Sequence, residues 1–216
     1  VPQERIDYFP NSAEAFYCPV DREQAAALDR ELPEGFRVLF AGNIGAAQDF
    51  ETILTAAELL KTHPQIVWVV IGDGRLRPWV EEEVERRGLS GRVTLVGRKP
   101  AEEMPRYFAW ADLLLVTLRR EPIFALTIPS KVQSYLACAR PVLAALEGEG
   151  AQVLEESGGG YACPPEDPQA LAETVLRMYG LTETERQAMG NNGRDYYLKQ
   201  FERELLLDRL EGWLRE

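Results

Sequence analysis

The unit that decides the fold is a helix leading directly into an apolar strand, and it is clearest in Ile128-Pro129-Ser130-Lys131-Val132-Gln133-Ser134-Tyr135-Leu136-Ala137-Cys138-Ala139-Arg140-Pro141-Val142-Leu143. A polar, proline-marked turn precedes the helix, and Arg140-Pro141 ends it before the strand begins. The first N–H groups of a helix point outward and carry partial positive charge, so a helix N-terminus can bind phosphate. Lys131 adds a full positive charge at the same end. We therefore expect the chemistry of this chain to lie here.

The same alternation of helix and strand continues on both sides of this stretch. Most of the apolar runs are short, continuous and rich in β-branched residues, which is typical of strands buried on both faces. The predicted strands are 38–41, 66–71, 93–96, 113–118, 142–146 and, more weakly, 160–163. The predicted helices are 50–60, 76–87, 101–109, 131–139, 152–156, 168–179, 183–199 and 202–215. This pattern predicts a Rossmann-like α/β fold, a doubly wound parallel sheet of about six strands with helices on both faces.

Composition limits the functions that the chain can have. Its 216 residues are 45% hydrophobic and carry a net charge of −11, which argues against a nucleic-acid partner but leaves room for a nucleotide site with local positive charge. Cys18, Cys138 and Cys163 are odd in number and far apart, which fits neither a disulfide framework nor a zinc ribbon. No apolar run approaches the roughly 18 residues that a membrane span needs. We expect a protein of the cytoplasm.

Three segments are expected along the chain. It begins Val1-Pro2 without a methionine or signal peptide, which predicts a piece of a longer polypeptide. Residues 1–33 contain scattered prolines and little periodicity, and are predicted to be an interdomain linker. Residues 34–200 form the α/β domain, and residues 201–216 form a C-terminal helix.

Glycine-containing turns follow the first three predicted strands. Gly42-Asn43-Ile44-Gly45 could let the backbone approach a ligand closely, although it matches neither a dinucleotide fingerprint nor a P-loop, and a plain strand-to-helix turn is an equal alternative. Gly72-Asp73-Gly74 and Gly97-Arg98-Lys99 follow the next two strands. Ligands of open α/β sheets bind beyond the carboxyl ends of the strands, so we expect these turns and Pro129-Ser130-Lys131 to outline one site.

Other catalytic arrangements are not visible in the sequence. No pair of carboxylates has a spacing that indicates acid–base catalysis, and the charges between Glu81 and Arg87 suit a solvated helix face. His63 is the single histidine and precedes a proline at a predicted helix end. No pattern of metal ligands or of a Ser–His–Asp triad is present, so neither metal nor nucleophilic catalysis is predicted.

Taken in order, these segments resemble the C-terminal, donor-binding domain of retaining GT-B glycosyltransferases of family 4. The resemblance covers most of the chain. It rests on Val38–Gly45 with Gln48, on Ile71–Gly74, Val93–Gly97 and Tyr107–Leu113, on the linker residues Pro10-Asn11, and on Pro129-Ser130-Lys131 with Tyr135–Ala137 and Arg140–Val142. The last group is most similar to the branch that builds capsule, O-antigen and related surface polysaccharides.

The sequence also departs from the family pattern. Many members carry a Glu-x7-Glu pair around the donor helix, and alignment places Leu126 and Ser134 at these two positions. The Arg and Lys that often bind the diphosphate after the first strand are replaced at about Asn43 and Gln48. Lys131 is then the best remaining cation, and a lysine acts as a point charge, not as a bidentate clamp.

The resemblance implies roles for individual residues. Lys131 would be the catalytic residue. Thr127 would cap the helix, with Pro129 in its first turn. Ser134 would hydrogen-bond a ribose hydroxyl, and Arg98 or Lys99 would lie near the base. The donor-binding residues that it implies are Gly42, Asn43, Gly45, Gln48, Gly72, Gly74, Arg98, Thr127, Ile128, Ser130 and Ser134.

The function that the resemblance implies is transfer of a sugar, from a UDP-sugar, to a glycan or lipid-linked acceptor without a metal or other cofactor. The acceptor would bind to a preceding N-terminal domain, towards which residues 201–216 would pack, so this chain alone should bind nucleotide and transfer nothing. The full-length protein could touch the inner face of the plasma membrane. Loss of both glutamates leaves a non-catalytic scaffold module as the alternative, and a sugar-nucleotide epimerase is less favoured because no acid–base set is visible.

Overall fold

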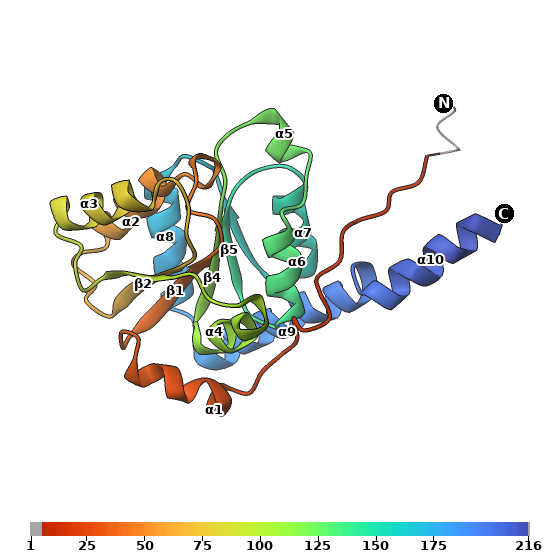
Figure 1. The fold of residues 1–216 in the computed structure, drawn as a ribbon, viewed down its shortest axis with the longest axis horizontal. Helices are drawn as coiled ribbons and strands as arrows, with labels where there is room; N and C mark the ends of the chain where they lie inside the picture. Colours follow the sequence, from red (N-terminus) through yellow and green to blue (C-terminus); the bar gives the residue numbers. More distant parts are fainter. Residues whose placement is uncertain (1–5, 216) are drawn as a thin grey trace.

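The computed structural model describes residues 6–215 and shows a six-stranded, entirely parallel sheet (Figure 1). Residues 1–5 of the predicted linker and residue 216 of the predicted C-terminal helix lie outside the described residues. The strands are β1 (Phe36–Ala41), β2 (Ile66–Ile71), β3 (Val93–Gly97), β4 (Leu113–Thr117), β5 (Val142–Ala145) and β6 (Gly160–Cys163). Their order is β3-β2-β1-β4-β5-β6.

This order confirms the predicted Rossmann-like fold. The chain moves outward from β1 to β3 and then returns to place β4 on the other side of β1, with Val38 opposite Leu113. The helices that follow β1 and β4 therefore leave the sheet in opposite directions, which opens a crevice at the carboxyl ends of these two strands. The continuous apolar runs are explained by burial, since every residue of β2, β4 and β5 is buried.

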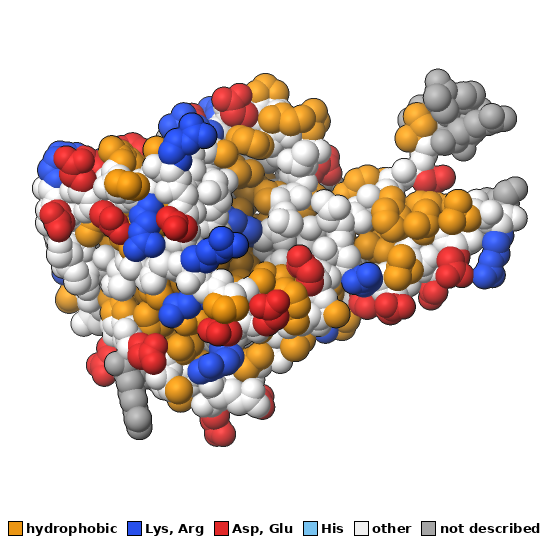
Figure 2. All heavy atoms as spheres, viewed as in Figure 1, with side chains coloured by type: hydrophobic (Ala, Val, Ile, Leu, Met, Phe, Trp, Pro, Cys, Tyr) orange, Lys and Arg blue, Asp and Glu red, His pale blue; other side chains and the backbone are white. Residues whose placement is uncertain are grey.

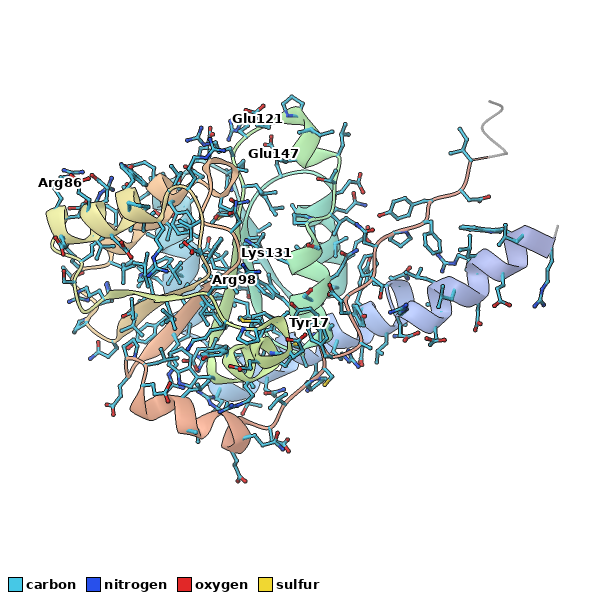
Figure 3. All side chains as sticks on the ribbon, in the orientation of Figure 1. Tyr17, Arg86, Arg98, Glu121, Lys131 and Glu147 are labelled. Carbon is cyan, nitrogen blue, oxygen red and sulfur yellow. The ribbon has the colours of Figure 1, made fainter. Side chains whose placement is uncertain are left out.

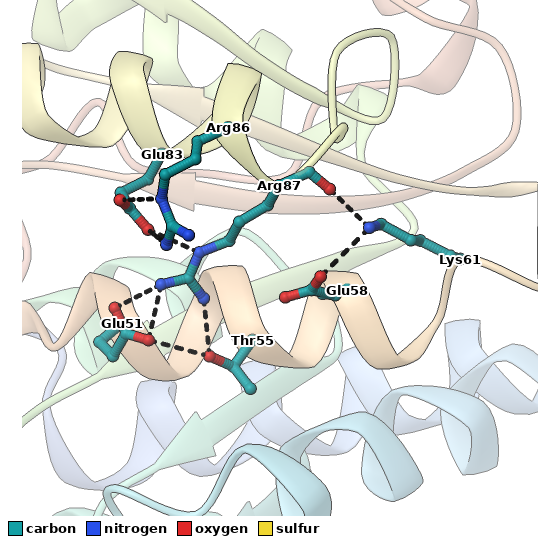
Figure 4. Close-up of polar contacts among 7 residues, drawn as sticks. All are labelled: Glu51, Thr55, Glu58, Lys61, Glu83, Arg86 and Arg87. Carbon is teal, nitrogen blue, oxygen red and sulfur yellow. Dashed lines mark hydrogen bonds and ion pairs between the residues drawn. The ribbon is translucent and has the colours of Figure 1, made fainter.

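One face of the sheet is covered by α2 (Phe50–Leu59), α3 (Arg77–Arg86) and α8 (Pro168–Tyr179) (Figure 1). Phe50 and Ile53 of α2 and Leu171 and Val175 of α8 lie on the core side, at the spacing of an amphipathic helix. An ion-pair cluster joins the exposed sides of α2 and α3, with the Arg87 guanidinium hydrogen-bonded to Thr55 at 2.9 Å (Figure 4). This side of the molecule is therefore tied together both by its core and at its surface.

The other face is covered by α4 (Met104–Trp110), α6 (Ser130–Ala137), α7 (Glu149–Ser157) and α9 (Glu183–Gln200). A Cβ at Gly190 of α9 would lie 2.2 Å from the Ala139 carbonyl oxygen, so glycine is what lets α9 approach the end of α6. Beyond α9, α10 (Arg203–Arg215) runs away from the sheet beside the start of the described chain (Figure 1). Its link to that segment includes the edge-to-face pair of Phe9 and Trp213, with ring centroids 6.1 Å apart.

The predicted linker is more ordered than its sequence pattern indicates. It contains α1 (Arg22–Ala25) and the 3₁₀ helix η2 (Ala26–Arg30), and α1 lies against α4. Arg22 forms an ion pair of 2.9 Å with Asp112 at the start of β4. Two further 3₁₀ helices, η3 (Ala46–Gln48) and η4 (Ala101–Glu103), and the short α5 (Pro122–Ala125) were not predicted as separate elements.

Candidate functional site: a cleft at the carboxyl edge of the sheet

A cleft of about 610 Å³ lies where the strands β1, β2 and β3 end, beside the first turn of α6. Its volume is within the range of small-molecule sites. Of the residues predicted to bind the donor or act in catalysis, seven line this cleft: Gly42, Asn43, Gly72, Arg98, Ser130, Lys131 and Ser134. The structure thus brings together three loops and one helix that the sequence places up to about ninety residues apart.

The loops after β1 and β2 hold each other at the floor of the cleft. The Ile44 N–H donates to the Asp73 carbonyl at 2.8 Å, and Ile44 itself is fully buried. Gly72 has a φ of +144°, and a Cβ there would lie only 1.8 Å from the Gly42 carbonyl oxygen. Glycine at 72 is therefore required for the two loops to meet.

Lys131 is the second residue of α6, and its side chain extends across Gly42. A Cβ at Gly42 would lie 2.6 Å from Cε and 2.9 Å from Nζ of this lysine. The Nζ atom is 3.9 Å from the centroid of the Phe40 ring, a cation–π contact. Within residues 6–215, no hydrogen bond or ion pair satisfies this ammonium group. The charge therefore faces the cleft with its donors unused.

Burial lowers the pKa of Lys131 to about 7, because the charged form loses hydration beside the ring and the glycine loop. An anion in the cleft would reverse this effect by supplying the missing counter-charge. Lys131 as a whole residue is half-buried and lines the cleft, so its desolvated ammonium group remains within reach of a ligand. Figure 3 shows Lys131 beside Arg98, which follows β3 and adds a second cation to the lining.

The first turn of α6 differs from the predicted cap. Pro129, with φ −60° and ψ 133°, occupies the N-cap position, and the helix starts at Ser130 without a side-chain cap. The prediction that Thr127 caps this helix is wrong, because its hydroxyl donates to the carbonyls of Ile123 and Phe124 at the end of α5. The uncapped N–H groups of α6 are consequently left available to a ligand.

The remaining α6 side chains anchor the helix. The Ser134 hydroxyl donates to the Ser130 carbonyl at 3.1 Å, which uses its proton and leaves its oxygen able only to accept hydrogen bonds. The buried Tyr135 hydroxyl accepts from the Ala41 N–H at 3.2 Å and lies 3.3 Å from the Ala41 carbonyl. Tyr135 thereby fixes α6 to the end of β1, next to Gly42.

Five predicted donor-binding residues lie outside the lining of this cleft. Gly45, Gln48 and Gly74 support the loop after β1: the Asn43 amide donates to Gln48 at 3.4 Å, and a Cβ at Gly74 would lie 2.3 Å from the Ile44 carbonyl oxygen. Thr127 and Ile128 instead line a neighbouring groove of about 450 Å³, between the N-terminal linker and α7.

The pattern-based prediction missed the contribution of the N-terminal linker and of α4. Asn11, Ser12, Glu14, Tyr17 and Phe108 all line the cleft. Pro10-Asn11 identified the linker through the family resemblance. The sequence of residues 11–17 has no periodicity that would predict their place at the strand ends.

Among residues 6–215, no group of three or more His, Cys, Asp or Glu side chains is arranged to hold a metal ion. No helix in that part of the chain has the length and hydropathy needed to cross a bilayer.

The fold and the cleft define a doubly wound α/β domain with a cationic site at the topological switch point of its sheet. Residues 35–180 match the model of the family "Glycosyl transferases group 1", and the chain belongs to this family.

Comparisons with single proteins agree. The chain is 32% identical over 203 residues to the probable glycosyltransferase WbjE of Pseudomonas aeruginosa, covering 91% of this chain and 48% of that protein. It is 26% identical over 220 residues to alpha-D-kanosaminyltransferase of Streptomyces kanamyceticus, covering 100% of this chain and 55% of the relative. The chain therefore spans about half the length of these curated relatives.

Solved structures share the fold. Anabaena Alr3699/HepE in complex with UDP superposes with a TM-score of 0.84 and 19% identity, over 98% of this chain and 58% of that one. The C-terminal domain of the glycosyl transferase group 1 protein LpcC from Francisella tularensis has a TM-score of 0.70 and 21% identity, over 86% of this chain and 95% of that one. The fold is thus that of the C-terminal half of a GT-B glycosyltransferase.

Proposed function

We propose that this chain is the donor-binding domain of a retaining family 4 glycosyltransferase, which transfers a sugar from a UDP-sugar to a glycan or lipid-linked acceptor. The observation that carries the proposal is the Lys131 ammonium group. It has no hydrogen-bonding partner within the described residues, and it lies at the start of α6 in a cleft that Gly42 and Gly72 also line. A buried cation of this kind needs an anion, and a diphosphate at a helix N-terminus supplies one.

In the proposed mechanism, Lys131 and the free N–H groups of α6 stabilise the negative charge that builds on the departing diphosphate. This is an electrostatic role, in which the residues bind the transition state more tightly than the substrate. The bond between the anomeric carbon and the diphosphate oxygen breaks, the acceptor oxygen bonds to the same carbon from the face that the leaving group vacates, and the hydroxyl proton passes to the departing diphosphate. The reaction as proposed requires no metal and no other cofactor.

The named relatives favour this substrate class. Alr3699/HepE has been solved with UDP and with UDP-glucose, and other relatives are a putative colanic acid glycosyl transferase, WcaI, and an amylovoran glycosyltransferase, AmsK. These support UDP as the nucleotide and surface polysaccharide as the product.

The remaining region of such an enzyme would bind the acceptor. In this proposal, residues 1–33 link the two domains, residues 34–200 bind the donor, and residues 201–216 pack towards the N-terminal domain. The enzyme would work in the cytoplasm, with access to the inner face of the plasma membrane.

Calorimetry of this chain against UDP, GDP, CDP, ADP and TDP tests the proposal. We expect UDP to bind most tightly, and Lys131→Ala to weaken that binding about tenfold or more, because a charge-assisted hydrogen bond contributes roughly 1.5–3 kcal/mol. Lys199→Ala, which removes an exposed lysine of α9, is the matched control and should leave the affinity unchanged.

Two outcomes would contradict this reading. Absence of binding to every nucleotide would favour the scaffold alternative, which Leu126 and Ser134 at the positions of the family glutamates motivate. Unchanged UDP affinity in Lys131→Ala would remove the role given to this lysine.

A further inference from the structure

The N-terminal linker forms one wall of the cleft although it lies outside the helix–strand pattern of the fold. It contributes Asn11, Ser12, Glu14 and Tyr17 to the lining. These residues are held in place from several sides. The Gln133 amide donates to the Asn11 carbonyl at 2.7 Å, and the Tyr17 ring stacks on Phe108 with a centroid separation of 5.9 Å and an interplanar angle of 8°. The linker wall is thus built onto α6 and α4.

Glu14 is the feature of this wall that needs an explanation. Glu14 is exposed and is one of the residues that line the cleft, and within the described residues its carboxylate has no hydrogen bond or ion pair. The other carboxylate in the lining, Asp73, accepts the Gly74 N–H at 2.8 Å within its own loop. A cleft that holds Lys131 and Arg98 for an anion would gain nothing from a free carboxylate facing the same anion.

Glu14 is placed in the cleft by the turn that it shares with Tyr17. The Tyr17 N–H donates to the Glu14 carbonyl at 2.9 Å, so the two residues share one turn of the linker, on the α4 side of the cleft. Burial and then the negative charge of Glu14 raise the pKa of Tyr17. In Figure 3, Tyr17 lies below Lys131 and Arg98, towards α4.

A free carboxylate in a nucleotide cleft suits the neutral, hydroxyl-rich part of the ligand. A ribose offers two adjacent hydroxyl donors, and acidic side chains bind such hydroxyls in other α/β nucleotide sites. Ser134, a polar residue of α6 in the same lining, already donates its hydroxyl to Ser130. Its oxygen is a neutral acceptor with two lone pairs, whereas a carboxylate has about four acceptor sites, and charge-assisted hydrogen bonds are stronger.

We propose that Glu14 recognises the ribose of the nucleotide, so that the linker and not α6 supplies the carboxylate of this cleft. The inference rests on the proposed function and deepens it, because it assigns selectivity for ribonucleotides to one residue. The ligand spans the cleft with its diphosphate at Lys131 and its ribose hydroxyls at Glu14.

The test is calorimetry of UDP, 2′-deoxy-UDP and 3′-deoxy-UDP with the wild-type chain and with Glu14→Gln. Removing the negative charge also lowers repulsion of the diphosphate, which affects all three ligands alike, so the ratio of affinities is the decisive quantity. We expect the wild type to prefer UDP about tenfold or more over at least one deoxy analogue, and Glu14→Gln to reduce that preference to about twofold or less.

A control variant makes the result specific. Asp21→Asn changes an exposed carboxylate of the same linker outside the cleft and should keep the preference of the wild type. A preference that survives Glu14→Gln, or that Asp21→Asn reduces as much as Glu14→Gln does, overturns this inference while leaving the proposed function intact. A wild-type chain that binds none of the three overturns the proposed function and this inference with it.

Discussion

At the scale of single residues, Lys131 shows how a site can be recognised by an unsatisfied charge. Its pKa is lowered to about 7 from an ordinary value of 10.5, because desolvation is not offset by a partner. The folded pKa lies below the unfolded one, so this ammonium destabilises the unliganded fold below about pH 7. The destabilisation is lost as the pH rises from about 7 to 10.5. The residue that causes this destabilisation of the fold lies where the diphosphate is proposed to bind.

The pH dependence of UDP binding follows from this pKa. Above about pH 7 the free protein loses the proton of Lys131, and binding must first restore it, so we expect the affinity for UDP to fall progressively between pH 7 and 9. Calorimetry at several pH values measures this directly. In Lys131→Ala, affinity is expected to be weak and nearly independent of pH over the same range. A wild-type affinity that stays level from pH 7 to 9 would refute the assignment.

Residue patterns predicted some of these roles and not others. Lys131 and Gly42 could be placed because strand ends and helix starts have recognisable local signals, and parallel strands bring these signals to one edge. Glu14 and Tyr17 could not, because linker residues have no periodicity and their orientation depends on contacts with Gln133 and Phe108, which are distant in sequence.

At the scale of elements, the α2–α3 side of the molecule is stabilised by a polar cluster as well as by its core. Glu83 is a buried residue of α3. Its carboxylate accepts hydrogen bonds from both Arg86 and Arg87 at 2.7 Å (Figure 4). Arg87, whose side chain is 8% exposed, continues across to Glu51 on α2 at 2.6 Å. These charges were predicted to form a simple solvated face, and the correction arises because α2 lies against α3, so that one arginine bridges the two helices.

The Glu83→Gln substitution tests the contribution of this cluster. The two arginines lower the pKa of Glu83 from 4.5 to about 2, so its stabilising effect is complete above about pH 4.5 and is lost as the pH falls towards 2. We expect the variant to have a lower melting temperature than the wild type at pH 7, with the difference closing between pH 4.5 and 2.

Glu82→Gln provides the control for this experiment. It removes an adjacent carboxylate that is exposed and is not part of the cluster, so its melting temperature should stay near that of the wild type throughout. A Glu83→Gln variant as stable as Glu82→Gln at pH 7 would show that the cluster is not stabilising.

At the scale of the whole molecule, the domain has an apolar surface beyond its own core. The exposed side chains of α10 include Leu205, Leu207 and Leu214. Figure 2 shows hydrophobic side chains gathered along the visible side of this helix. The start of the described chain runs beside this helix. Both features lie away from the sheet, and they suit the proposal that α10 packs on a further domain.

Activity is therefore expected to require more than this domain. Calorimetry should show that the chain by itself binds UDP. In the presence of acceptor it should release no UDP from a UDP-sugar, because the proposal assigns acceptor binding to a region outside the donor domain. The full-length protein should release UDP and elongate its acceptor, and its Lys131→Ala form should not. Chromatography of the reaction mixture detects any glycosylated product. Such a product formed by this chain alone would contradict the proposal that donor and acceptor bind to separate domains.

The sequence by itself determined the fold class and the edge of the sheet where the site lies. The apolar runs and the amphipathic helices between them are local patterns that the sequence shows directly. Parallel strands joined through a helix almost always connect with a right-handed crossover, and this rule leads from the patterns to a doubly wound parallel sheet. Only the tertiary structure decided how the cleft is completed. It placed Glu14 in the lining of the cleft, put Pro129 and not Thr127 at the N-cap of α6, and left Lys131 without a counter-charge within the described residues. These features depend on contacts between segments distant in sequence, and no local pattern specifies such contacts.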